Sequence, residues 1–126
     1  LNHALIKRLK IDDVRRAVQY AKNVGIAVGL NVVIGSPYER QDSVQKTIEV
    51  INELSPAALS LSVYAVYPGS KAWNSVSETL YEQPHSRASF WSQFDEGYGA
   101  FHYASEDDVA HILKLFKTQL RHEIAL

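Results

Sequence analysis

The sequence predicts an α/β protein built around a parallel β-sheet, and three observations support this fold class. An amphipathic helical pattern spans residues 11–25. An almost wholly apolar run follows at residues 26–34, which is typical of a strand buried on both faces of a parallel sheet. A second helical pattern and a second strand then repeat this order with short connections, which indicates βαβ units.

The first predicted helix has apolar and charged residues on different faces. The apolar residues recur at helical spacing: Val14, Ala17, Val18, Ala21 and Val24. Asp12 and Asp13 suit the positive amino-terminal end of the helix dipole, and Lys22 suits the other end. Gly25 is suited to the left-handed conformation that ends many helices. We therefore expect the helix to stop there.

The predicted strand at residues 26–34 has two different faces. The bulky face contains Ile26, Val28, Leu30, Val32 and Ile34, and the smaller face contains Ala27, Gly29, Asn31 and Val33. We expect the bulky face to pack under helices, and the smaller face to leave room for a ligand. Asn31 is the polar residue of this run, and it is either a hydrogen-bonded core amide or a residue that lines a cavity.

A turn composition at residues 35–40 leads into the second predicted helix. The apolar stripe of this helix consists of Val44, Ile48, Ile51 and Leu54. Asp42 precedes Gln45 by three residues, a spacing that predicts a capping box. The helix is expected to end at Ser55 and Pro56, where the second predicted strand approaches.

The second predicted strand covers residues 58–66 and alternates in polarity. One face contains Leu59, Leu61, Val63 and Ala65, and the other contains Ser60, Ser62, Tyr64 and Val66. The more polar face either looks into a cavity or meets water at an edge of the sheet. The sequence leaves both readings open.

The chain divides into three parts: βα repeats at residues 1–73, an irregular aromatic-rich segment at 74–104, and a C-terminal helix at 105–126. The stripe of this helix contains Val109, Ile112, Leu113, Phe116 and Leu120. Acidic residues precede this stripe and basic residues follow it, as the helix dipole favours.

Composition excludes several function classes. The 126 residues suit one domain, and the formal net charge of -1 gives no electrostatic argument for nucleic acid. No apolar run approaches the roughly 20 residues that cross a bilayer, so we expect a cytoplasmic protein without membrane contact. The chain has no Cys, and its five His residues show no metal-ligand spacing. Leu1 in place of an initiator Met suggests a piece of a longer protein.

Residues 22–70 resemble the later part of radical S-adenosylmethionine (radical SAM) domains. The family's helix-ending turn matches residues 23–26, and its G-x-P-G-E-T loop matches Gly-Ser-Pro-Tyr-Glu-Arg at 35–40. Its T-I-x-x-I-x-x-L helix matches residues 47–54, and its P-Y-P-G-T segment matches Val-Tyr-Pro-Gly-Ser at 66–70. Within this family, the motifs most resemble those of the cobalamin-associated branch, and the oxygen-independent coproporphyrinogen oxidase-like branch is the alternative. Tyr38 and Arg40 depart from the family loop.

The resemblance implies the carboxy-terminal half of a partial TIM-type barrel. It implies an oxidoreductase or transferase in which a [4Fe–4S] cluster cleaves SAM to a 5′-deoxyadenosyl radical. The cluster would be held by an amino-terminal half that this chain lacks, so the isolated chain is expected to be inactive. The partner is that remaining half, and the substrate is open. The residues expected at the cofactor are Asn31, Val33, Ile34, Gly35, Pro37, Glu39 and Tyr67.

Other interpretations remain. Gly35, Pro37 and Glu39 are alternatively a turn that caps the next helix, and residues 67–70 are equally suited to turn chemistry. At the level of the whole chain, one alternative is an interaction module that forms a homodimer through its strands, because unpaired strand edges invite association. Another is half of a different TIM-barrel enzyme, with a phosphate at its strand ends.

Overall fold

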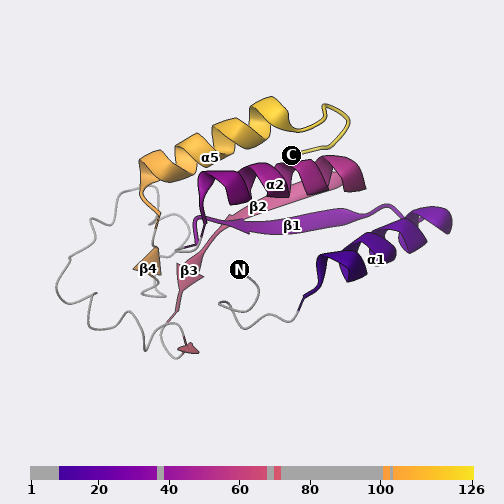
Figure 1. The fold of residues 1–126 in the computed structure, drawn as a ribbon, viewed down its shortest axis with the longest axis horizontal. Coiled ribbons are helices and arrows are strands. Elements are labelled where there is room, and N and C mark those ends of the chain that lie inside the picture. The colour runs from indigo at the N-terminus through magenta and orange to yellow at the C-terminus, as the bar shows by residue number, and fades with distance from the viewer. Residues whose placement is uncertain (1–8, 37–38, 68–69, 72–100, 103) are drawn as a thin grey trace.

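The computed structural model describes residues 9–36, 39–67, 70–71, 101–102 and 104–126. The described elements are α1 (Ile11–Asn23), β1 (Gly29–Ile34), α2 (Gln41–Leu54), β2 (Ala58–Val63), β3 (Ala65–Val66), β4 (Phe101–His102) and α5 (Glu106–Gln119). The three helices lie side by side along the parallel strands β1 and β2, with α2 between α1 and α5 (Figure 1). The chain is therefore a mixed α/β protein, as the sequence predicts.

Strands β1 and β2 form a parallel pair in continuous register from Gly29 opposite Ala58 to Ile34 opposite Val63. The run predicted as a strand from residue 26 enters the sheet at Gly29. Ile26 lies before the strand because its N–H donates to the carbonyl of Ala21, 2.9 Å away, at the end of α1. The parallel pairing predicted from the two apolar runs is confirmed.

The second predicted strand divides where the chain leaves the parallel sheet. The N–H of Tyr64 still donates to the carbonyl of Ile34 at 2.7 Å. Residues 65–66 then form β3, which pairs antiparallel with β4. Val66 is only 1 % exposed, so its predicted place on the polar face with Ser60 and Ser62 is wrong. The alternation fails there because β3 belongs to another sheet.

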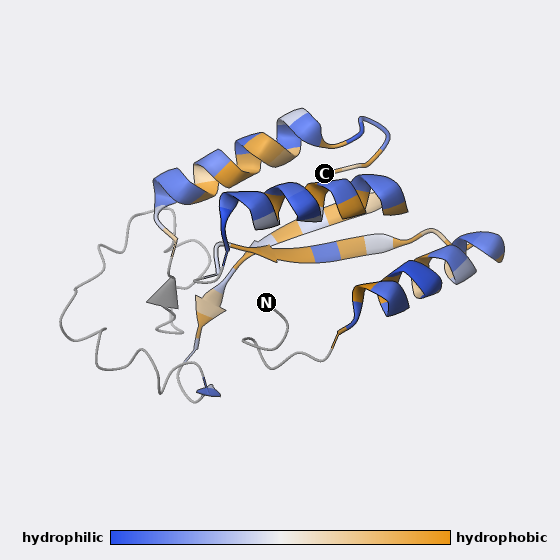
Figure 2. Ribbon diagram, in the orientation of Figure 1, coloured by the Kyte–Doolittle hydropathy of each residue, from blue (hydrophilic) through white to orange (hydrophobic). Residues whose placement is uncertain are grey.

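The core lies between one face of the parallel sheet and the helices α2 and α5. Its buried members are Ile34, Val44, Ile48, Ile51, Leu59, Val109, Ile112, Phe116 and Ile124. The remaining residues of the bulky face of β1, Leu30 and Val32, pack against this cluster. Both strands are largely hydrophobic, whereas the helices mix hydrophobic and hydrophilic residues (Figure 2). Within β1 the bulky face therefore packs under helices as predicted, whereas Ile26, which was assigned to the same face, precedes the strand and is 60 % exposed.

The local sequence predicts the end of α1 correctly but not the cap at the start of α2. Gly25 has φ +78° and its N–H donates to the carbonyl of Lys22 at 3.0 Å, which ends α1 in a Schellman motif. The capping box predicted from Asp42 and Gln45 is wrong. Helix α2 starts at Gln41, and the hydroxyl of Ser43 accepts the N–H of Arg40 at 2.8 Å.

The carboxy-terminal helix begins as predicted. The hydroxyl of Ser105 accepts the N–H of Asp108 at 3.1 Å, and the carboxylate of Asp108 accepts the N–H of Ser105 at 3.2 Å. Helix α5 ends at Gln119, so its predicted extension to residue 126 is wrong, and the chain after it returns to the sheet. Ala125 accepts the N–H of Leu59 at 2.7 Å and forms a parallel bridge with Ala58. A third segment therefore touches β2 on the side away from β1.

None of the helices within the described ranges has the length and apolar character needed to cross a bilayer.

Candidate functional site at the carboxyl ends of the strands

The predicted cavity residues Asn31 and Val33 share the face of β1 that points away from the core. Both are exposed, and Val33 retains 40 % of its accessible surface. The Oδ1 of Asn31 accepts the hydroxyl of Ser62 at 3.2 Å, across the strand pair. Asn31 is therefore no buried core amide, and its side chain stands on the free face of the sheet.

Ser60 and Ser62 extend this polar face onto β2. Both serines are exposed, and the register places Ser60 opposite Asn31 and Ser62 opposite Val33. The residues of the same strand that turn to the other face are covered by helices, with Leu59 only 4 % exposed. The structure thus brings a small polar row together on one side of the sheet, as the alternation of residues 58–63 predicts.

Ile34 lies on the opposite face from Asn31 and Val33. It is 2 % exposed and belongs to the helix-covered core. Its carbonyl accepts the N–H of Tyr64. Its side chain therefore packs in the core. The position of this side chain gives no support to the prediction that Ile34 contacts a cofactor.

Gly35 ends β1 in a conformation that favours glycine. Its φ is +77°, and a Cβ at this position would lie 2.9 Å from the Cβ of Ala104 and 3.6 Å from Cγ1 of Val63. Gly35 is buried. The sequence suggested that Gly35 lets a ligand approach the backbone, but the space beside its Cα is filled by this chain's own residues.

Glu39 folds back onto the loop that it ends. Its Oε2 accepts the N–H of Gly35 at 2.6 Å and the N–H of Ser36 at 3.3 Å. Its own N–H donates to the carbonyl of Ser36 at 3.0 Å. Burial raises the pKa of the Glu39 carboxyl, and the hydrogen bonds from the two backbone amides oppose that rise. Glu39 therefore closes the loop, which is the turn-shaping role considered for it.

Ser36 is the site residue that sequence reasoning missed. It is 8 % exposed, and its hydroxyl is buried with no hydrogen-bond partner in the described part of the structure. Leaving a buried hydroxyl unpaired costs about 1–3 kcal/mol. The signal available in the sequence was its place between Gly35 and Pro37 at the end of a buried strand, but a serine in a turn is ordinary.

The remaining two residues predicted at the cofactor are Pro37 and Tyr67. Pro37 lies outside the described residues. Tyr67 follows β3 and is 46 % exposed, and its carbonyl accepts the N–H of Ser70 at 3.1 Å and the hydroxyl of Ser70 at 2.8 Å. The described part of the 67–70 segment is thus a hydrogen-bonded turn, in line with the turn chemistry considered for it.

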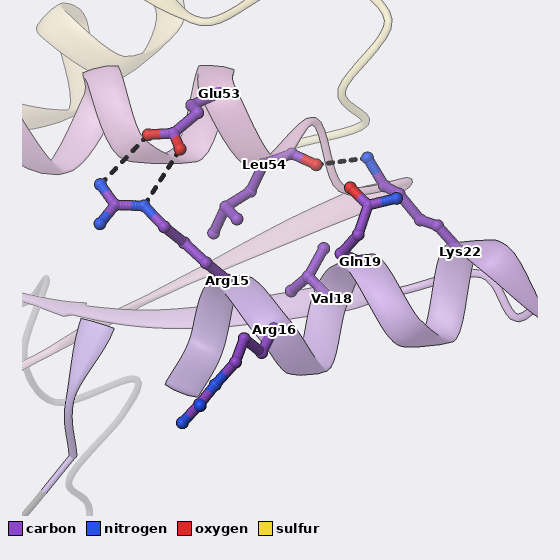
Figure 3. A pocket seen from close by; sticks show the side chains of 7 residues that line it. All are labelled: Arg15, Arg16, Val18, Gln19, Lys22, Glu53 and Leu54. Carbon is purple, nitrogen blue, oxygen red and sulfur yellow. Dashed lines mark hydrogen bonds and ion pairs between the residues drawn. The ribbon is translucent and has the colours of Figure 1, made fainter. Parts of the chain in front are cut away.

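A separate hollow of about 380 Å³ lies between α1 and α2 (Figure 3). Arg15 reaches across it to Glu53, with Nε at 3.0 Å and Nη2 at 3.2 Å from the two carboxylate oxygens. Lys22 donates to the carbonyl of Leu54, at the carboxyl end of α2. The ion pair with Glu53 raises the pKa of Arg15. This hollow is a seam between two helices, at the end of the sheet away from Gly35.

Metal chemistry has no ligand set within the described ranges. No group of three or more His, Cys, Asp or Glu residues there is arranged to hold an ion. The chain as a whole contains no Cys, so it supplies no thiolate for an iron–sulfur cluster.

Comparisons with protein-family models, with curated proteins and with solved structures find no match for this chain.

Proposed function

We propose that this chain is part of a radical SAM enzyme and forms the carboxy-terminal half of its partial TIM-type barrel. The observation that carries the proposal is the loop at the end of β1. It follows a parallel strand that is covered by helices on one face, holds Gly35 at positive φ and is closed by Glu39. In parallel barrels, ligands bind at the carboxyl ends of the strands.

The free face of the sheet favours a barrel rather than a doubly wound sheet as the fold of the whole domain. A doubly wound sheet has helices on both faces, whereas a barrel has them on the outside only. Here α2 and α5 pack on the face of Leu30, and the face of Asn31 is exposed. In a closed barrel that exposed face would become the lining of the interior.

The residues of this chain fit a nucleoside cofactor only in part. Asn31, Val33 and Ser62 offer a small, mostly polar surface, and the loop at Gly35 lies at the matching end of the strands. The cluster would have to be held by the amino-terminal half. When bound, the cluster and SAM together supply the 5′-deoxyadenosyl radical, while this chain positions the nucleoside and the substrate.

The test uses the protein with whatever coding sequence precedes Leu1. Anaerobic reconstitution with iron and sulfide, followed by reduction in the presence of SAM, should release 5′-deoxyadenosine. The control is replacement of the upstream cysteines by alanine, which should abolish this product. If the preceding roughly 200 residues, a span of barrel-domain size, hold no three closely spaced cysteines, the proposal is overturned.

A second candidate is an interaction module without chemistry. It is favoured by the side of β1 away from β2, which pairs with no strand among the described residues. Val24, Ile26 and Val33 leave apolar surface exposed, at 54 %, 60 % and 40 %. Sedimentation of the purified full-length protein tests this candidate: a stable dimer that forms no 5′-deoxyadenosine supports it, and a monomer contradicts it.

A further inference from the structure

We propose that residues 120–126 form a strap that closes the outer edge of β2, the edge away from β1, and that Asn52 latches this strap. When the strap opens, the edge becomes available to pair with β2 of a second copy of the chain. The inference does not depend on the proposed function. It concerns a different edge of the sheet from the β1 edge of the interaction module considered above.

The strap occupies the amino-terminal end of the edge of β2. The N–H of Leu59 donates to the carbonyl of Ala125 at 2.7 Å, and the N–H of Ala125 donates to the carbonyl of Ala57 at 3.3 Å. These two bonds make the parallel bridge between Ala58 and Ala125, and β2 continues beyond it to Val63. The strap therefore takes the place that the start of a neighbouring strand would take.

Asn52 on α2 holds the chain where it leaves α5. Its Nδ2 donates to the carbonyl of Gln119 at 2.9 Å, and its Oδ1 accepts the N–H of Arg121 at 2.9 Å. One amide side chain thus bonds an acceptor and a donor of the same backbone stretch. Ile124 is 5 % exposed and belongs to the core cluster. The strap is therefore fixed by the Asn52 amide, the Ile124 side chain and the Ala125 backbone.

The sequence of β2 lacks the residues that usually keep an edge strand from pairing with another molecule. Natural edge strands carry charged residues or Pro, or are covered by another segment. Residues 58–63 read Ala-Leu-Ser-Leu-Ser-Val and contain no charged residue, no Pro and no Gly. Segments of this kind pair with identical segments once they are exposed. Cover by the strap is therefore the protection of this edge, and β2 of a second copy is the partner expected when the cover opens.

The strap is held more weakly than the strand that it covers. Strands β1 and β2 pair in register along the whole of β2, whereas the strap contributes a single bridge. Residues 121–123, which lead to that bridge, are exposed. Segments with few buried contacts and exposed hydrogen bonds open locally, at a lower free energy than the core. We therefore expect the strap to open while the sheet stays folded.

Limited trypsin digestion of the full-length protein measures the opening, because cleavage after Arg121 requires the strap to leave the edge. Cleavage after Lys46, inside α2, requires unfolding of the core and serves as the reference. In the wild type, cleavage after Arg121 should be the faster of the two. Asn52→Ala should accelerate it about fivefold to thirtyfold, the value of two hydrogen bonds. The matched control Asn23→Ala removes an amide that bonds Gln19 on α1, and it should leave this rate unchanged.

Sedimentation of the same variants measures what the opened edge does. Asn52→Ala should associate to twice the mass of the wild type, and Asn23→Ala should not. A disulfide between Ala58→Cys and Ala125→Cys locks the strap, because these exposed residues are partners in the bridge and neighbouring strands lie about 4.8 Å apart. In the Asn52→Ala background, oxidation of this pair should restore the wild-type mass, and reduction should return the doubled mass.

Each contrary result overturns a specific statement. If cleavage after Arg121 is as slow as cleavage after Lys46, the strap does not open by itself and the inference fails. If Asn52→Ala leaves the rate after Arg121 unchanged, Asn52 is not the latch. If Asn52→Ala opens the strap but keeps the wild-type mass, the edge of β2 does not pair with a second copy. A doubled mass that persists in the oxidised disulfide variant places the association at another edge.

Discussion

Helices α1 and α2 flank the same strand and carry similar sequence patterns, yet they are buried very differently. Helix α2 buries all four residues of its predicted stripe: Val44, Ile48, Ile51 and Leu54. Of the five stripe residues predicted for α1, only Val18 is buried. The pattern of a helix thus predicts that it has an apolar face, but its burial depends on the partners that the fold provides. Helix α2 lies against two strands and α5, whereas α1 has α2 beside it.

The largest test of this contrast removes core volume from α2. Ile48 is 1 % exposed, so Ile48→Ala should lower the free energy of unfolding by about 2–5 kcal/mol. Val24→Ala on the α1 side is the matched truncation at a 54 % exposed site, and it should change stability by less than about 0.5 kcal/mol. Urea titrations of both variants give the two values. A large effect of Val24→Ala would mean that α1 is covered as well as α2.

The loops that follow α1 and β1 extend the contrast, because each holds a glycine at positive φ. Gly25 has φ +78°, and a Cβ placed there would have no heavy atom within 4 Å, whereas Gly35 has φ +77° and a Cβ there would lie 2.9 Å from the Cβ of Ala104. Gly25→Ala should therefore cost only the backbone strain, about 1–2 kcal/mol. Gly35→Ala adds overpacking of roughly a further 1–3 kcal/mol.

A double-mutant cycle isolates the cost of overpacking against Ala104. In the Gly35→Ala background, Ala104→Gly removes the opposing carbon, so the excess cost over Gly25→Ala should largely disappear. Thermal and urea unfolding of the four proteins measure the coupling. If Gly35→Ala costs no more than Gly25→Ala, the close packing of the strand-end loop against Ala104 is disproved.

Glu39 tests how the loop after β1 is held. Glu39→Ala leaves two backbone amides without their acceptor and should cost about 1–3 kcal/mol. Glu39→Gln should restore most of this stability, because both amides bond a single oxygen, Oε2, and an amide also carries one. Equal losses in the two variants would show that the charge, and not the acceptor oxygen, closes the loop.

The stability of the wild type should depend on pH in a direction that follows from the pKa of Glu39, and Glu39→Gln is the comparison. Because burial raises the pKa of Glu39 in the folded protein, the folded state favours the protonated carboxyl relative to the unfolded chain. The wild type should therefore lose a small amount of stability as the pH rises from the ordinary carboxyl pKa through the raised pKa of the folded state. Glu39→Gln should lack this step. Urea titrations across that pH range compare the two.

The sequence predicts the elements of this fold well because each is marked locally. Apolar spacing predicts α1, α2 and α5, and the runs of residues 26–34 and 58–66 contain the two parallel strands. The break after Val63 was not predictable, because it depends on β4, which begins only at Phe101. Non-local partners of this kind leave no mark in the local alternation.

The candidate site was predicted as a location more than as a set of contacts. The turn of residues 35–40 does follow the predicted parallel strand, and Asn31 does face away from the core. The prediction that this strand is buried on both faces is wrong, because the face of Asn31 and Val33 is exposed. Ile34 was assigned to the cofactor although its side chain alternates onto the core face, a distinction that the strand period already contains. That Glu39 would take backbone amides and that Ser36 would be left unpaired depends on the path of the loop, which residue types alone do not define.

The smallest expected effect concerns the seam between the two helices. Arg15 bonds Glu53 through two nitrogens and Asp12 through a third, but it is exposed to solvent. Glu53→Gln should therefore destabilise the protein slightly at low salt, and the difference from wild type should vanish in high salt, where exposed charges are screened. Glu49→Gln, on the same helix, is a suitable control for the loss of one charge. A difference that persists in high salt would mean that the α1–α2 contact depends on this ion pair, and that the packing of Val18 contributes little to holding α1 in place.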